Sequence, residues 1–348
     1  DVYKRQTFLI MKISKTVPTH YGISLLRILA TLSVIIIHVA APLVMKFGKI
    51  SNFDWNVANI YDSMSRYAVP VFFMISGALL LGRDSEIKDF LKNRLGKILP
   101  PFLFWSLFYS VTNRYVFTQE TFSISKIIRD VFYGSKYHLW FVYALIGVYL
   151  ITPIIQKWLK FSENKEILYF LIIWVITLFL TIPGIAIYFP KINLAYFSGY
   201  LGYFILGYYL KNYGMQRKLI SYSLLFVGLA ITILGSYYMT QKNGVFYDYF
   251  YEYLCINTLL VSMGIFLLFN TIETINDNLK PIISKLNECS FGIYLVHPLV
   301  LNIFGLLGIG GSFISPVIGI LIVSLTCFLL SFFLIFSIKK IKFGHLIA

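Results

Sequence analysis

The chain has 348 residues, of which 58% are hydrophobic and only 13% are charged, and its mean hydropathy is +0.76. Soluble globular domains carry about a quarter charged residues, so this composition excludes a soluble protein, and its 32 Phe and 26 Tyr exclude a disordered one. The net charge of +15 would suggest nucleic-acid binding in a soluble chain. In a membrane protein it instead reports orientation, because cytoplasmic loops collect Lys and Arg.

Ten apolar segments follow one another along the chain, and a membrane-spanning helix needs roughly 20 such residues. We therefore predict an all-α polytopic membrane protein with about ten transmembrane helices and no separate soluble domain. Residues 1–10 precede the first methionine and are expected to be a non-native or disordered leader, so that residues 11–348 form one transmembrane domain. The predicted spans lie near residues 22–45, 59–82, 99–118, 138–156, 167–187, 194–210, 218–240, 250–271, 289–307 and 313–337.

Basic residues are distributed unevenly between alternate loops. If the N-terminus is cytoplasmic, twenty Lys and Arg fall in cytoplasmic loops and tails, eight fall on the opposite side, and Arg27 and Arg66 lie within spans. This asymmetry predicts that both termini are cytoplasmic. The positive-inside rule alone explains the charge of the cytoplasmic loop at residues 83–97. Arg94 and its basic neighbours in that loop would also attract the phosphates of a nucleotide cofactor.

Ionisable side chains inside a membrane are costly, so each one in a predicted span is a candidate functional residue. Arg27 and His38 lie eleven residues apart on the first span. At about 100° and 1.5 Å per residue, they share one helix face and are separated by roughly 16 Å along the axis. Arg27 then lies near the cytoplasmic end and His38 in the outer third. The structural alternative is that Arg27 reaches the inner lipid headgroups and that His38 hydrogen-bonds a neighbouring helix.

The second predicted span places Arg66 at about the depth of His38. Asp62 precedes Arg66 by four residues, which predicts an ion pair on one helix face, and the alternative is a solvated helix end. Farther along this span, Pro70 can interrupt the helical hydrogen bonds, and Ser76 before a glycine permits close backbone approach. Ordinary tight packing is the alternative explanation of this stretch.

Two further histidines fall in or beside predicted spans. His138 begins the fourth span on the outer side, where it is a candidate to bind an acceptor, and its neighbour Trp140 also fits the aromatic belt of a membrane protein. His297 lies near the middle of the ninth span, where core packing explains it as well as a site role does. The three cysteines have neither disulfide nor metal-ligand spacing, so we expect no metal site.

Four motifs in a fixed order give the chain a family resemblance. It resembles the acyltransferase-3 family of bacterial integral-membrane O-acyltransferases over nearly all of residues 20–340. The subgroup that O-acetylates enterobacterial common antigen is the most similar, because of Tyr-His-Leu-Trp at 137–140 and Tyr-Leu-Ile-Thr-Pro at 149–153. The four motifs are Arg27-x10-His38, Ser65-Arg66 followed by Val69-Pro70-Val71-Phe72-Phe73-Met74-Ile75-Ser76-Gly77, His138-Leu139-Trp140-Phe141, and Ile293-Tyr294-Leu295-Val296-His297.

This resemblance implies a membrane O-acyltransferase of the bacterial plasma membrane. The implied donor is acyl-CoA, usually acetyl-CoA, on the cytoplasmic side. The implied acceptor is a hydroxyl of a cell-surface polysaccharide or lipid-linked glycan, often on the outer side, and neither nucleic acid nor metal is expected. Arg27 and His38 match the essential pair of the family, whereas Arg66 and His138 match motif positions whose roles are less defined.

These expectations combine into one mechanism. The nucleotide end of the donor binds near the first-span arginine and the basic loop, and His38 takes the proton from the acceptor hydroxyl as it attacks the thioester. Arg66 or Ser76 stabilises the oxyanion, and an outer carboxylate, Asp62 or Glu252, orients His38. Direct attack and a transient acyl-histidine intermediate both fit the sequence.

Two other function classes remain open at this point. A transporter or flippase for a glycan or a lipid-linked sugar would also use intramembrane Arg and His and span-breaking prolines. Against it, no half-chain repeat pairs Arg27-x10-His38 with a counterpart in the second half. A non-catalytic membrane scaffold would not need His38 and Arg66 at matching depth.

Overall fold

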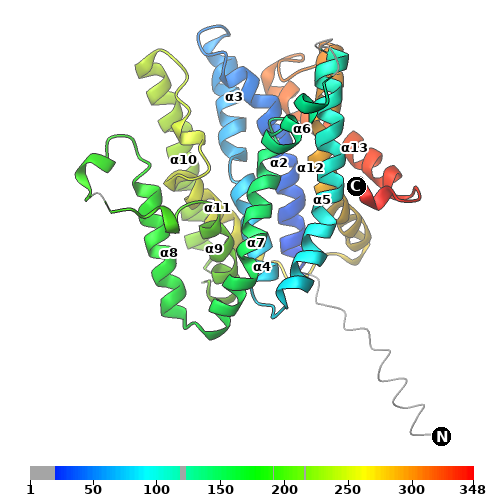
Figure 1. Cartoon of the computed structure of the whole chain (residues 1–348). Helices are drawn as coiled ribbons and strands as arrows, with labels where there is room; N and C mark the ends of the chain where they lie inside the picture. The colour runs from blue at the N-terminus through cyan, green and yellow to red at the C-terminus, as the bar shows by residue number, and fades with distance from the viewer. Residues whose placement is uncertain (1–19, 118–122, 191, 215–216) are drawn as a thin grey trace, which may run out of the picture.

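The computed structural model describes residues 20–117, 123–190, 192–214 and 217–348. Every regular element in these residues is helical, which confirms the predicted all-α class. Figure 1 shows most of the long helices standing roughly side by side in one bundle. The predicted leader at residues 1–10 lies outside the described part of the chain.

The long helices follow the chain in an order close to that of the predicted apolar segments. Short 3₁₀ turns lie between some of them, and a π-helix, η1 (Thr112–Phe117), continues α5. The α-helices are α2 (Tyr21–Val44), α3 (Asn52–Ser65), α4 (Ala68–Leu80), α5 (Ile87–Val111), α6 (Ile124–Tyr133), α7 (Trp140–Phe161), α8 (Asn164–Phe179), α9 (Leu201–Tyr213), α10 (Lys218–Asn243), α11 (Ile256–Asn270), α12 (Lys280–Leu306) and α13 (Pro316–Lys339).

Seven helical stretches of the described chain are long and apolar enough to cross a membrane, and α3 with α4 counts as one of them. The prediction was ten. The other three predicted segments also fold as helices, but α5 begins in a charged stretch, and α8 and α9 have only 16 and 13 residues. The chain is therefore a polytopic α-helical membrane protein, with seven stretches rather than ten that meet the length and composition of a span.

Two predictions at prolines differ from the structure. α5 begins at Ile87 rather than near residue 99, and Pro100 and Pro101 lie inside it. The break in the second span falls between Ser65 and Ala68, ahead of Pro70, which lies in the first turn of α4. First-turn residues have no helical partner for their N–H, so a proline there begins a helix instead of breaking it.

Helix α6 was not predicted. It is short and amphipathic, with Ile127 buried against the protein while Ile124 and Ile128 are exposed. Its ten residues are too few and too polar to resemble a membrane span, so the apolar pattern of the sequence does not indicate this helix.

The first span, α2, is the centre of the bundle, where it contacts α3, α4, α11, α12 and α13. Its small residues allow this close packing, and Ala30 and Ala40 are completely buried. The start of α2 and the end of α13 lie at the same end of the molecule. We call it the basic end, because Arg94, Lys97 and Lys339 gather there. Residues on α2 therefore face several neighbouring helices at every depth.

Large apolar side chains remain exposed along the outer helices. On α13, Leu321, Leu325 and Phe333 are 42%, 40% and 58% exposed, and on α10 Phe226 and Leu234 are 63% and 64% exposed. Soluble proteins rarely expose continuous apolar faces of this kind, whereas lipid chains cover them without cost. These faces are the lipid-contacting surface of the bundle.

Candidate active site

Three histidines from separate parts of the chain meet in the interior, and we call them the histidine cluster. His38 comes from α2, His138 from the loop before α7, and His297 from α12. The His38 and His297 rings stack with centroids 5.3 Å apart and an interplanar angle of 13°. The His138 and His297 rings also lie 5.3 Å apart, at 74°. His297 is thus the ring that joins the other two.

The proton position on His297 follows from its hydrogen bond. Its Nδ1 lies 2.7 Å from the carbonyl oxygen of Tyr294, and a carbonyl can only accept, so Nδ1 carries the proton. In the neutral ring Nε2 then has a free lone pair, and it is buried without a hydrogen-bond partner among the described residues. Both ring nitrogens of His138 are buried in the same condition. The cluster therefore contains unmet hydrogen-bonding capacity, which is costly unless a bound group or water satisfies it.

His38 differs from its two neighbours in exposure. His138 is 2% exposed and His297 is completely buried, whereas His38 is half-buried. The other ring against His38 is that of Tyr137, at 4.7 Å between centroids. His38 is therefore the most accessible member of the cluster, and its neighbour Tyr137 lines a hollow described below.

Two tyrosines fix the loop that carries His138. The hydroxyl of Tyr294 on α12 donates to the backbone carbonyl of His138. The hydroxyl of Tyr109 on α5 donates to the carbonyl of Leu295 at 2.8 Å, and its ring lies 5.5 Å from that of His138. Both residues are almost fully buried, so the loop and α12 are held together on either side of the imidazole.

A cavity of about 670 Å³, the inner cavity, extends from the basic end toward the cluster. Tyr294 lines it and also contacts His138 at 5.4 Å between ring centroids. Arg27 lines it too, with Nη1 donating to the Asn287 side chain on α12 at 2.9 Å. The lining combines four basic side chains, one acidic side chain and several aromatic ones, namely Arg27, Arg94, Lys97 and Lys339, then Glu288, and then Phe72, Phe141, Tyr149, Phe291 and Tyr294.

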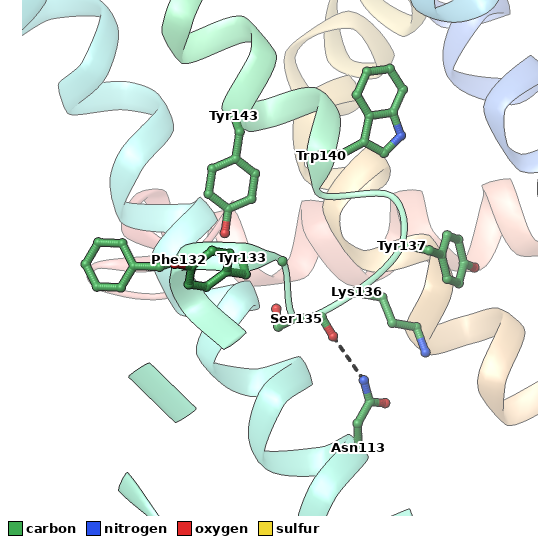
Figure 2. A pocket seen from close by; sticks show the side chains of 9 residues that line it. Asn113, Phe132, Tyr133, Ser135, Lys136, Tyr137, Trp140 and Tyr143 are labelled. Atoms are coloured by element: carbon green, nitrogen blue, oxygen red, sulfur yellow. Dashed lines mark hydrogen bonds between the residues drawn. The ribbon is translucent and has the colours of Figure 1, made fainter. Parts of the chain in front are cut away.

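A second hollow of about 670 Å³, the outer pocket, lies at the opposite end of α5 from Arg94. It is lined by residues 132–137 of the α6–α7 connection together with Asn113, Trp140 and Tyr143. Figure 2 shows Lys136 and Tyr137 leaving the loop on the same side, while the amide of Asn113 donates to the Ser135 carbonyl at 3.1 Å. Tyr137 therefore joins the outer pocket to His38.

The described residues contain no group of three or more His, Cys, Asp or Glu that could hold a metal ion, and the stacked imidazoles are not arranged to chelate one. The three cysteines are free and buried. The chemistry available at this place is that of imidazole, hydroxyl and guanidinium groups between two hollows.

The acyltransferase-3 family model, described as an acyltransferase domain, matches residues 20–336. The chain belongs to this family. No curated protein and no solved structure gave a match. The match covers the whole histidine cluster, the outer pocket and most of the lining of the inner cavity, whose residues Lys339, Leu346 and Ala348 follow it.

The structure of the acyltransferase brings most of the predicted residues together. Arg27, Ser76 and Arg94 all line the inner cavity, and Trp140 lines the outer pocket. Arg27 and His38 share the α2 face that meets α12, as their spacing predicts, and Arg27 is bound to Asn287 instead of reaching lipid headgroups.

The predicted ion pair of Arg66 and Asp62 is present, with Nε 2.6 Å from Oδ1. Asp62 is completely buried and the guanidinium also stacks over Tyr251 at 4.5 Å, so the alternative of a solvated helix end is wrong. Tyr253 lies beside both Arg66 and Trp140, at 6.0 Å and 5.6 Å, which connects this pair to the outer pocket.

The prediction that Asp62 or Glu252 orients His38 is wrong. Asp62 is paired with Arg66, and Glu252 is exposed, so the rings beside His38 are those of His297 and Tyr137. A buried aspartate beside an arginine satisfies the arginine first, because the bidentate pair offsets the cost of burying both charges.

Sequence reasoning missed three residues that connect the parts of this acyltransferase. Tyr137 lies between the outer pocket and His38, Tyr294 lies between the inner cavity and His138, and Asn287 binds Arg27. Both tyrosines stand inside the quoted motifs, next to His138 and three residues before His297. That adjacency was the available signal, but tyrosine is too common in this chain to stand out without the fold.

Proposed function

We propose that this membrane acyltransferase moves an acetyl group from cytoplasmic acetyl-CoA to a hydroxyl of a cell-surface or lipid-linked glycan, with His38 as the general base. The observation that carries the proposal is the arrangement of two hollows at opposite ends of the bundle, each bordered by a tyrosine whose ring contacts the histidine cluster. A donor and an acceptor on opposite sides of a bacterial plasma membrane need this arrangement in order to react without either of them crossing.

The inner cavity suits the donor. Acetyl-CoA has an anionic, phosphate-bearing nucleotide end and a thin pantetheine arm that ends in the thioester. The basic residues Arg27, Arg94 and Lys97 would bind the phosphates, and the aromatic side chains of the lining would surround the arm. The volume of about 670 Å³ falls within the range of small-molecule sites. The side of the membrane follows from the charge asymmetry of the loops.

The transfer balances with one base. His38 accepts the proton of the acceptor hydroxyl while that oxygen attacks the thioester carbonyl, so a C–O bond forms and the C–S bond breaks. The proton then passes to the departing thiolate, and free coenzyme A leaves through the basic end. Ser76 lines the inner cavity and is the candidate hydrogen-bond donor to the oxyanion, whereas Arg66 is held by Asp62 and acts through its charge.

The test is His38→Ala in purified protein reconstituted into lipid nanodiscs. Transfer of radiolabelled acetyl from acetyl-CoA to glycan should fall at least about 100-fold, which is the usual contribution of a general base. Thermal unfolding and acetyl-CoA binding should stay unchanged, and Lys46→Met, which removes an exposed charge after α2, should transfer normally. Undiminished transfer by His38→Ala would remove His38 from the chemistry. Saturable glycan translocation without acetyl transfer would identify a transporter instead.

A further inference from the structure

The outer pocket contains one charged side chain among its lining residues, and it is a cation, Lys136. The remaining lining residues are aromatic, small or neutral. A glycan site built for a neutral sugar needs only rings and neutral hydrogen-bonding groups. The lysine therefore needs an explanation.

The partners of Lys136 among the described residues are neutral. Its ammonium group donates to the Asn302 side chain at 3.4 Å and lies 5.5 Å from the ring centroid of Tyr137 and 6.0 Å from that of Tyr109. No carboxylate of the described chain forms an ion pair with it. It is half-buried in the loop between α6 and α7, and this burial lowers the pKa of Lys136. A cation held among rings without an acid is ready to receive an anionic group.

The sequence around the pocket strengthens this charge. Of the eight Lys and Arg assigned to the outer side, four lie between residues 114 and 136. Arg114 is bound by Asp130, with Nε 2.6 Å from Oδ2, but Arg129 is exposed on α6, the helix whose last residues line the pocket. The positive-inside rule disfavours basic residues on this side, so topology does not explain their concentration here.

Lys136 is also close to the reacting groups. It precedes Tyr137, whose ring lies 4.7 Å from that of His38. Figure 2 shows both side chains on the same side of the loop, with Trp140 at the start of α7. A sugar that rests on these aromatic rings with its anionic substituent at Lys136 has its hydroxyls directed toward the histidine cluster.

We propose that the outer pocket selects an anionic glycan as acceptor and that Lys136 binds its negative group, which is the carboxylate of an acidic sugar or a phosphate on the sugar. This inference rests on the proposed function, because it names the acceptor class of that same site. Lys136 is a specificity residue here, distinct from the base.

The experiment measures binding of three probes to the nanodisc protein by microscale thermophoresis. The probes are a hyaluronan tetrasaccharide for the carboxylate, N-acetylglucosamine 1-phosphate for the phosphate, and neutral N-acetylchitotetraose. At least one anionic probe should bind about tenfold more tightly than the neutral one, as a charge-assisted hydrogen bond allows. Lys136→Met should abolish this preference, Lys136→Arg should keep it, and Lys46→Met should leave it unchanged.

The pattern of binding separates the sources of the anion. Preference for the tetrasaccharide alone identifies an acidic sugar, and preference for the phosphate alone identifies a phosphorylated one. Equal binding of the neutral probe, no binding of either anionic probe, or an unchanged preference in Lys136→Met would overturn the proposal.

Acetyl transfer, measured on the same samples, keeps this inference separate from the proposed function. His38→Ala should lose transfer while retaining the preference for anionic probes. Transfer to anionic glycans that is as fast in Lys136→Met as in the wild type would leave the acyltransferase mechanism standing and remove the specificity. Binding of an anionic probe by a wild-type protein that transfers no acetyl group would support the specificity and contradict the acyltransferase mechanism.

Discussion

The imidazole of His297 is held in one tautomer by its Nδ1 hydrogen bond to Tyr294, and its plane is set parallel to that of His38. A flat, fixed neighbour restricts the rotation of His38 and so keeps its lone pair directed to one place. Such orientation accounts for a large part of catalysis by a general base, because the reacting atoms start close to the required geometry.

Replacing His297 by phenylalanine tests this role. Phe keeps a flat ring of similar size in the stack but loses the Nδ1 hydrogen bond, so we expect kcat to fall about tenfold while KM for acetyl-CoA stays unchanged. Steady-state transfer assays in nanodiscs measure both constants. An unchanged kcat would mean that His297 only packs. If the variant unfolds at a lower temperature and loses activity for that reason, His297 has a structural role. The variant His297→Gln, which can keep a hydrogen bond without a ring, would then separate the two contributions.

The site was predictable from sequence where one helix carries the information. Arg27 and His38 share a face because of helical periodicity, and Arg66 with Asp62 is an i, i+4 pair. The contact of His38 with His297 joins positions more than 250 residues apart, so no local pattern encodes it. The buried state of Asp62 likewise depends on Tyr251 and its neighbours, which arrive from a distant turn.

At the scale of helices, α4 and α9 pack through reciprocal glycines. A Cβ added at Gly77 would lie 1.7 Å from the backbone oxygen of Phe204, and one added at Gly207 would lie 2.0 Å from that of Met74. Helices in membranes associate through such close backbone approach, because lipid gives them no hydrophobic drive to pair. α4 carries Phe72 and Ser76, so this contact also positions one wall of the inner cavity.

Alanine at either glycine should therefore force the helices apart. We expect Gly77→Ala to destabilise the fold by about 2 kcal/mol, the middle of the range for overpacking. Gly147→Ala on α7 is the matched control, since nothing lies within 4 Å of its added Cβ, and better helix propensity should raise stability by about 0.5 kcal/mol. Thermal unfolding in detergent measures both. Equal midpoints for the two variants would contradict the packing argument.

An ion pair ties α6 to the end of α5. Asp130 accepts two hydrogen bonds from Arg114, at 2.6 and 2.7 Å, and one from Ser110 at 2.7 Å. The hydrogen bonds from Arg114 and Ser110 hold the pKa of Asp130 below its usual value, against the opposing effect of burial. A carboxylate with a depressed pKa stabilises the fold above its unfolded pKa, and that contribution disappears as the pH falls through the folded value.

The attachment of α6 should thus be constant between pH 5 and 7 and weaken only below the ordinary aspartate pKa of about 3.9. Asp130→Asn should weaken it at pH 7 by about 2 kcal/mol, which is about 30-fold faster hydrogen exchange in residues 124–133. Hydrogen exchange read by mass spectrometry measures this, and Asp248→Asn, at an exposed aspartate, is the control. Exchange rates that still differ between pH 7 and 5 after correction for the intrinsic pH dependence of amide exchange would exclude Asp130 as the titrating group.

Helix identity was predictable because apolar runs of about 20 residues have few other structures available in a membrane. The first and last residues of the helices were less predictable. The start of α5 lies thirteen residues before Pro100 among charged residues, and the whole of α6 is too short and polar to register as a span. Both lie where the chain leaves the apolar interior, and there tertiary contacts such as the Asp130 ion pair decide the structure.

At the scale of the whole molecule, the two hollows lie at opposite ends of the bundle, and the proposed function assigns one substrate to each end. We expect sealed vesicles with acetyl-CoA on the side of the basic end and glycan on the opposite side to form product. In intact vesicles with both substrates outside, only one hollow of each protein is accessible, so little product should form. Detergent, which opens the vesicles, should then restore product formation. Radiolabel on the glycan measures the outcome. Full activity in intact vesicles with both substrates on one side would show that the two hollows open to the same compartment.

The thin layer of rings between the two hollows has an electrical consequence. Tyr294 borders one hollow, Tyr137 borders the other, and the imidazoles lie between them. Solvent in both hollows brings the two aqueous potentials close together, so most of the membrane voltage falls across this layer. One elementary charge moved through the full voltage gains or loses about 2.3 kcal/mol per 100 mV. The acetyl group is uncharged, and a proton on His38 travels only part of the field, so turnover should depend weakly on voltage, unlike the transport of a charged glycan.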